Sequence, residues 1–138
     1  MPDAAVFMRQ IGLLLLISTL LCACASIDDR KRNSAFDIDT ALYAKAIRWG
    51  DLTTAEQLQR LDDTQPVRPP PADQTRVTSY ETLRVTPAGD GSTVTLTVKI
   101  SYYHTDGMTL KSVTDQQVWI YDADEQHWYI TTPLPELR

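Results

Sequence analysis

Residues 94–102, VTLTVKISY, decide the fold, because apolar and polar side chains alternate along them without a break. Every second position is apolar: Val94, Leu96, Val98, Ile100 and Tyr102. Successive side chains of a β-strand point to opposite faces, so this pattern predicts a strand with one buried and one solvated face. The threonines and serine of the polar face predict a solvated surface, which would also suit contact with another protein.

Three more segments have the composition of strands, namely residues 76–86, 111–122 and 127–132. The connections between the four segments are short and rich in Gly, Asp and Pro, which favour tight turns. Strands joined by short turns pair as antiparallel neighbours, so the sequence predicts a four-stranded antiparallel meander.

Two helices are expected before the strands. The first spans residues 35–49, with Ser34 as its capping residue and Gly50 as its stop. The second is shorter, spans residues 54–62 and opens with a capping box that begins at Thr53. Residues 65–73 contain four prolines, which predict an extended connection from the helices to the sheet.

The first helix is expected to cover the sheet. Leu42, Ala46 and Trp49 share one helical face, so we expect that face, Trp49 included, to be buried. A sheet with one apolar face needs such a cover, and the helical pair is the available one. The predicted fold class is therefore α+β, with the N-terminal helices packed on a curved four-stranded antiparallel meander.

Over residues 35–132, this order of elements and the placement of the aromatic residues resemble the NTF2-like, cystatin-type cone. They also resemble small proteobacterial lipoproteins that carry such a domain. The resemblance implies a cavity between helix and sheet, with Tyr43, Trp49, Tyr102 and Trp119 as its possible lining. A plain sandwich of helices on a sheet fits the same pattern.

In the enzymatic members of that family, polar side chains face the cavity. Besides Tyr43 and Tyr102, the resemblance nominates Tyr80, His104 and Asp115 for this position. The alternative for Asp115 is a place on the solvated face of its strand, and this is what we expect.

The N-terminal residues have the layout of an export signal, with Arg9 followed by an apolar run over residues 11–21 and then small side chains. As a helix that run would span only about 16 Å, whereas the hydrocarbon core of a bilayer is ~30 Å thick. Leu21-Cys22-Ala23-Cys24 resembles the lipobox of bacterial lipoproteins. The resemblance implies cleavage before Cys24, the acylated residue, and Ala25 after it is compatible with transfer to the outer membrane.

The expected organisation follows from this signal. Residues 1–23 form a lipoprotein signal peptide, with Met8 as a possible true start, and residues 24–34 form a lipidated polar tether. In extended form, residues 25–34 of that tether would reach at most about 33 Å. Residues 35–138 form a single α+β domain.

Candidate chemistry is sparse in residues 24–138. The net charge of the chain is −5, which argues against a nucleic-acid partner. His104 with Asp106, or His127 with Asp124 and Glu125, could supply metal ligands, but neither cluster has the spacing of a known metal site. We therefore expect ordinary turns there, and no catalytic residue, metal or cofactor.

The expected function is that of a non-enzymatic, outer-membrane-anchored lipoprotein that faces the periplasm and binds or scaffolds an envelope protein. The lipid on Cys24 would hold it to the membrane. The alternative is an NTF2-like cone that binds or converts a small ligand. A roomy cavity lined by polar groups would favour the second function, and a filled core the first.

Overall fold

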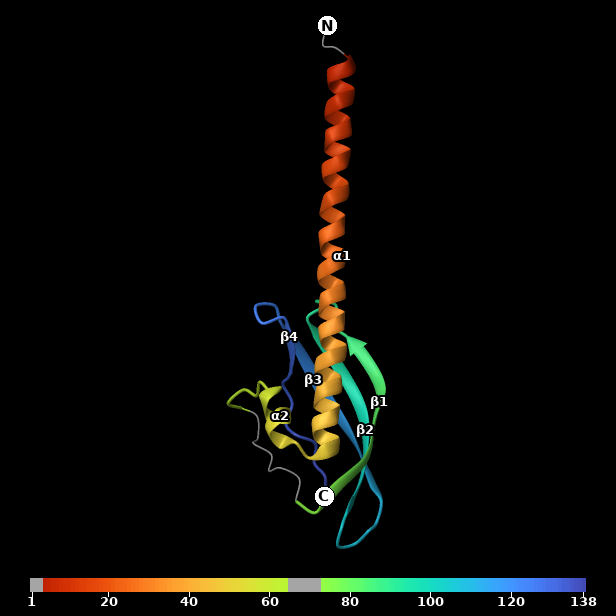
Figure 1. Ribbon diagram of the computed structural model, residues 1–138, viewed down its shortest axis with the longest axis vertical. Helices are drawn as coiled ribbons and strands as arrows, with labels where there is room; N and C mark the ends of the chain where they lie inside the picture. The colour runs from red at the N-terminus through yellow and green to blue at the C-terminus, as the bar shows by residue number, and fades with distance from the viewer. Residues whose placement is uncertain (1–3, 65–72) are drawn as a thin grey trace. The chain divides into compact units, whose positions relative to one another are not determined.

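The computed structural model describes residues 4–64 and 73–138, with side chains described from Ile27 onward. Its elements are helices α1 (Ala4–Trp49) and α2 (Leu52–Gln57) and strands β1 (Thr75–Pro87), β2 (Thr93–His104), β3 (Lys111–Asp122) and β4 (His127–Ile130) (Figure 1). The chain divides into two compact units, Met1–Ser34 and Ala35–Arg138. The proline-rich connection lies mostly outside the described residues.

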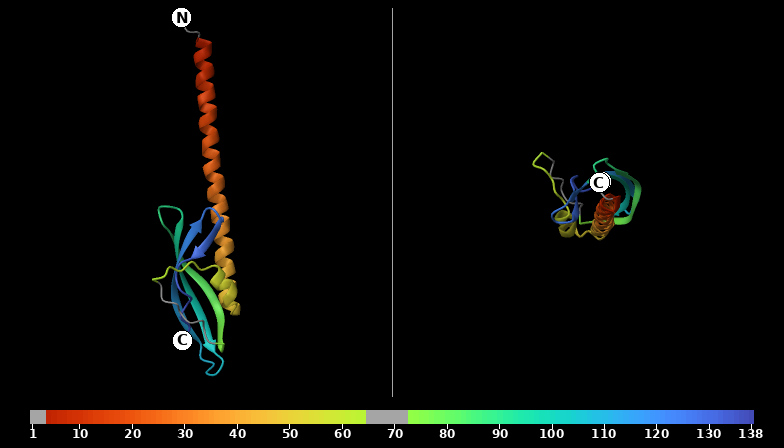
Figure 2. Two further views of the ribbon diagram at one scale, coloured as in Figure 1. Left: turned by 90° about the vertical axis from the view of Figure 1, so that its left-hand side faces the viewer. Right: turned by 90° about the horizontal axis from the view of Figure 1, so that it is seen from above.

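The sheet has the predicted antiparallel topology, in the order β1-β2-β3-β4. The alternation in β2 is confirmed, because all five apolar positions are buried while the threonines between them are partly exposed. The C-terminal part of α1 lies along one face of this open sheet, whose strands curve past the helix (Figure 2). The α+β class is therefore confirmed as a helix packed on a four-stranded antiparallel sheet.

The face of α1 that packs on the sheet is not the predicted one. Tyr43, Ala46 and Ile47 are buried, whereas Leu42 is 42% exposed and Trp49 is 77% exposed. Only Ala46 belongs to both the predicted and the observed face. The prediction failed because two apolar stripes share this helix, and spacing alone does not decide which of them meets the sheet.

Aromatic edge-to-face contacts join α1 to the sheet. The ring of Tyr43 lies 5.5 Å from that of Trp119, and the ring of Phe36 lies 5.0 Å from that of Trp128. The electron-poor edge of one ring meets the electron-rich face of the other in such pairs, which add to the stabilisation that burial alone provides. The core between helix and sheet is thus built from large rings.

The two ends of the predicted first helix have different outcomes. The helix stops as predicted, because Gly50 adopts a positive φ of 71° after the last helical residue. The predicted start at Ser34 is wrong, since α1 continues through that position. Residues 24–34 contain no Gly or Pro, and Arg32 pairs with Asp29 one turn away. The tether segment is therefore helical rather than extended.

The second helix is shorter than predicted and capped by another residue. Asp51 is the N-cap, and its carboxylate accepts hydrogen bonds from the backbone N–H and the hydroxyl of Thr54, which lower the pKa of Asp51. The helix ends at Gln57, because residues 58–60 leave it to pair with Ile130 of β4. Strand pairing thus replaces the last predicted turn of the helix.

The segment after β4 completes the core. β4 ends at Ile130, two residues earlier than predicted. Leu134 and Leu137 are buried in the same apolar cluster as the helix and sheet residues. The Tyr102 hydroxyl donates to the carbonyl oxygen of Arg138 at 2.6 Å, which ties this segment to β2.

Candidate functional site

The structure separates the four residues expected to line a cavity. Tyr43, Tyr102 and Trp119 are buried in the apolar core, while Trp49 lies on the surface. Because Tyr43 and Trp119 pack edge to face, their rings occupy the space between α1 and the sheet. Three of the four residues are thus core residues, and the fourth, Trp49, is exposed on the surface of the protein instead of lining a cavity.

A polar cluster lies on the helix-covered face of the sheet. The buried Gln117 is its centre: the amide Nε2 donates to Asp115 Oδ2 at 2.9 Å and to the Tyr80 hydroxyl at 2.8 Å. Trp119 Nε1 donates to Gln117 Oε1 at 3.3 Å. Tyr80 and Asp115, both nominated from the sequence, therefore meet through a glutamine that the sequence analysis did not single out.

Asp115 corrects a sequence prediction, because it shares the covered face of β3 with Gln117 and Trp119 instead of facing solvent. Its side chain is only partly buried. Burial raises the pKa of Tyr80, and the negative charge of Asp115 raises it further. The phenol thus stays protonated at neutral pH and can share its proton with the glutamine.

A groove opens beside this cluster, between α1 and β1. It has a volume of about 270 Å³, and its walls include Asp37, Thr40, Ala44, Tyr80 and Thr82. The walls of the groove are mixed in polarity, and the Tyr80 side chain connects it to the polar cluster. A small polar ligand is the kind of molecule that such walls could hold.

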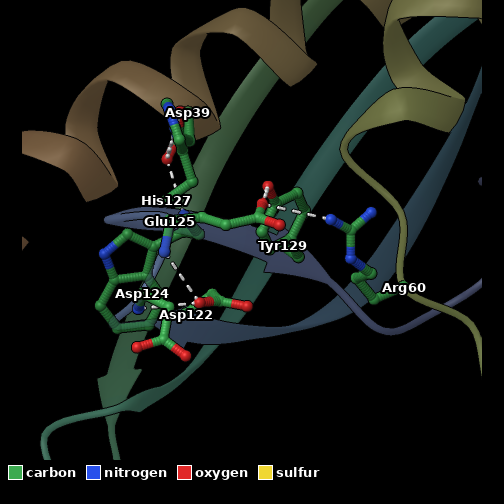
Figure 3. Close-up of polar contacts among 8 residues, drawn as sticks. Asp39, Arg60, Asp122, Asp124, Glu125, His127 and Tyr129 are labelled. Carbon is green, nitrogen blue, oxygen red and sulfur yellow. Dashed lines mark hydrogen bonds and ion pairs between the residues drawn. The ribbon is translucent and has the colours of Figure 1, made fainter.

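A second polar cluster surrounds a buried carboxylate that the sequence analysis missed (Figure 3). Asp39 of α1 is 2% exposed, and its Oδ2 accepts the backbone N–H of Trp128 at 2.7 Å. His127 Nδ1 lies 3.1 Å from Oδ1 of the same carboxylate. The signal was present in the sequence, because Asp39 lies three residues after Phe36 and four before Tyr43, on the apolar face that packs on the sheet.

Glu125, two residues before His127, has partners of its own (Figure 3). The Glu125 carboxylate accepts a hydrogen bond from the Tyr129 hydroxyl and pairs with Arg60 at 3.3 Å. The guanidinium of Arg60 also lies 3.9 Å from the centre of the Tyr129 ring. His127 therefore points to Asp39 while Glu125 points to Arg60, so the structure does not gather the histidine and the carboxylates into one site.

The turn between β3 and β4 is built as predicted, because Asp122 Oδ1 accepts the backbone N–H groups of Asp124 and Glu125 at 3.0 Å each. At the other end of the sheet, His104 Nδ1 lies 3.1 Å from the hydroxyl of Thr75. Among the described residues, no three His, Cys, Asp or Glu side chains lie close enough to hold a metal ion.

Cys24 lies among the residues whose side chains are not described, so its lipidation stays a prediction. Within the described part of the chain, no helix is both long and apolar enough to cross a membrane. The sequence matches no protein-family model, and neither a curated protein nor a solved structure is significantly similar to it.

Proposed function

We propose that this protein is an outer-membrane-anchored lipoprotein facing the periplasm, and that its Ala35–Arg138 domain binds another envelope protein without catalysis. The membrane part rests on the charged, apolar and small-residue regions of the signal and on the lipobox that ends at Cys24. The large rings of Tyr43 and Trp119 between helix and sheet support a binding role over a role as a ligand container.

The observation that carries the partner-binding role is the difference between the two edges of the sheet. The outer edge of β4 is covered, since Ile130 N–H donates to Leu58 O at 2.8 Å and Arg60 N–H donates to Ile130 O at 2.9 Å. On the outer edge of β1, no strand is paired among the described residues. Unpaired backbone N–H and C=O groups on an edge can bind an extended segment of another chain.

The side chains of β1 favour the same interpretation. Leu83 is 52% exposed and Val85 is 51% exposed, although both are large and apolar. Leu83 lies at a register shift, between the pairs that Thr82 and Arg84 make with β2, and has no partner residue on that strand. Proteins usually protect an open edge of a sheet. Exposed apolar side chains beside such an edge instead provide pockets and contacts for a partner strand.

Crosslinking tests this site directly. A photoreactive amino acid in place of Leu83 of the full-length protein, irradiated in intact cells, should give one discrete adduct whose partner peptide is identified by mass spectrometry. The matched control is the same amino acid in place of Thr114, which is exposed in the interior strand β3. Equal adducts from both positions, or none from position 83, would contradict binding at the β1 edge.

The anchor has an independent test. Cys24→Ala should leave an uncleaved protein without fatty acid, because processing and acylation both require the sulfur. Metabolic labelling with a fatty-acid probe measures this, and undiminished label on the variant would rule out Cys24 as the lipid site.

A small-ligand-binding cone is the second candidate, and the cluster of Tyr80, Gln117 and Asp115 beside the groove favours it. If a ligand occupies that groove, native mass spectrometry of the full-length protein should detect a bound small molecule. Thr82→Trp would fill the groove and remove the ligand, whereas Lys99→Gln on an exposed position of β2 would retain it. A protein free of bound molecules in both forms would count against the cone.

A further inference from the structure

The helix that covers the sheet is also apolar on its outer side. Ile38 is 62% exposed, Leu42 is 42% exposed and Trp49 is 77% exposed. These residues are four and seven positions apart, so all three lie on one face of α1. Large apolar side chains gathered on an exposed helix face mark a binding surface more often than single exposed ones do.

Positive charges share this face. Lys45 lies between Leu42 and Trp49 along the helix, Arg48 lies next to Trp49, and both basic side chains are exposed. Neither forms an ion pair within the described residues. The chain as a whole has a net charge of −5, so this face differs in sign from the average surface.

The acidic residues nearby do not neutralise the face. Asp39 is buried against Trp128 and His127 on the opposite side of the helix, and Asp51 caps α2. Asp37 lies in the wall of the groove toward β1, on the same side of the helix as Arg48, but three turns or about 16 Å before it, which is farther than exposed charges act in physiological salt. A partner that complements the outer face of α1 must therefore be apolar and anionic together.

Beside the C-terminal end of α1 lies a hollow of about 580 Å³, and basic and aromatic side chains line it as well. Its walls include Arg48, Trp49, Arg76 and Tyr103. The Arg76 guanidinium donates to the carbonyl oxygens of Asp73 and Thr75, which leaves its positive charge without a carboxylate partner in the described residues. Asp73 also borders the hollow and is the one acidic residue among the described residues of its wall.

We propose that the outer face of α1, formed by Ile38, Leu42, Lys45, Arg48 and Trp49, rests on the anionic headgroup layer of the membrane that holds the lipid of Cys24. The inference rests on the proposed lipid anchor. Leu and Ile side chains with Trp at the headgroup level, next to basic residues whose charged ends stay in water, are typical of helices that lie at a membrane surface. The three exposed apolar side chains would enter the interface, and Lys45 and Arg48 would meet lipid phosphates.

The position of the anchor favours a membrane over a protein as the occupant. Ile38 follows Cys24 by 14 residues, a length of chain that reaches at most about 50 Å. A lipid at that distance keeps the face near the bilayer, so that even a weak surface contact becomes populated. A stable protein interface needs about 800 Å² from each partner, more than these three side chains supply.

The fluorescence of Trp49 can report the contact in the intact protein. Full-length protein extracted from membranes is reconstituted into phosphatidylcholine vesicles with or without phosphatidylglycerol. In the anionic vesicles, Trp49 should emit at shorter wavelength, lose accessibility to acrylamide and be quenched by brominated acyl chains. The other two tryptophans, Trp119 and Trp128, are buried, and the spectrum of Trp49→Phe gives their contribution.

Charge variants separate this contact from a general effect of the vesicles. Lys45→Gln with Arg48→Gln should reduce the ratio of protected to exposed Trp49 by about 25-fold, because each basic residue at an anionic surface contributes a factor of about five. Lys99→Gln, on the exposed surface of β2, should leave the ratio unchanged. Equal loss from both changes would overturn the proposal.

The remaining outcomes distinguish the inference from the anchor on which it rests. Fatty-acid label on Cys24 with Trp49 still open to acrylamide would overturn the membrane contact and leave the anchor. Quenching by brominated lipid in unlabelled protein would support the contact and overturn the anchor. Protection from acrylamide without quenching by brominated lipid would overturn the contact in favour of a second copy of the chain.

Discussion

The two faces of α1 within the Ala35–Arg138 domain have similar apolar content and opposite surroundings. Tyr43 and Ile47 on the inner face are buried against the sheet, while Ile38 and Trp49 on the outer face are exposed. Hydrophobicity therefore does not select the face that packs. The comparison shows that the polar residues among the apolar ones decide, since they must either find partners or stay in water.

One charged residue on each face explains the choice. Asp39 lies on the inner face, and there its carboxylate receives the Trp128 N–H and lies against His127. Lys45 lies on the outer face, and burial of that face against the apolar side of the sheet would bury its ammonium group. An unpaired buried charge is costly, so the helix packs with the inner face toward the sheet.

The largest expected difference between the faces is in stability. Ile47→Ala should lower the free energy of unfolding by about 2–5 kcal/mol, because it leaves a cavity in the packed core. Ile38→Ala removes the same atoms from an exposed position and should change it by less than about 0.5 kcal/mol. Denaturant unfolding of the two variants measures both values, and equal losses would mean that the faces are not distinct.

The next test removes the carboxylate that fixes the inner face. Asp39→Ala should cost about 1–3 kcal/mol of unfolding free energy, because the buried N–H of Trp128 loses its acceptor. Asp37→Ala, on the exposed flank of the same helix, is the matched control and should be nearly neutral. A neutral effect of Asp39→Ala would show that this carboxylate does not determine how the helix packs.

The polar cluster of Tyr80, Gln117 and Asp115 should affect the free energy of unfolding at alkaline pH. The pKa of Tyr80 is raised in the folded protein by burial, so an unfolded chain releases this proton above about pH 10 while the folded chain retains it. Folding is therefore unaffected by this group below pH 10 and is weakened as the pH rises further, by at most about 1.4 kcal/mol per pH unit. Tyr80→Phe should flatten this slope in unfolding measurements at increasing pH, and parallel slopes would refute the assignment.

The smallest effect is expected on the outer face. Trp49→Ala should change the free energy of unfolding by less than about 0.5 kcal/mol, because the side chain is mostly in water. The sequence pattern predicts this tryptophan in the core, where its loss would cost about 3–5 kcal/mol. Denaturant unfolding in detergent micelles, where no anionic surface is present, distinguishes the two positions. A loss of several kcal/mol in the free energy of unfolding would show that Trp49 is buried.

Local pattern determined the sheet and the end of the first helix. The alternation in residues 94–102 requires one buried face, and the Gly- and Asp-rich turns around it leave little choice but antiparallel neighbours. Gly50 ends α1 because its positive φ suits glycine better than other residues. These features depend on residues close together in the sequence, and therefore on information that the sequence displays directly.

The tertiary structure decided what depends on distant partners. Asp39 is buried because Trp128, 89 residues away, supplies a backbone N–H, and α2 ends early because Ile130 offers strand pairing to residues 58–60. Gln117 joins Tyr80 to Asp115 only because the folded sheet places these side chains of β1 and β3 on the same, helix-covered face. The sequence around a polar residue shows its polarity but not its hydrogen-bond partner. The free energy of burying that residue depends on the partner.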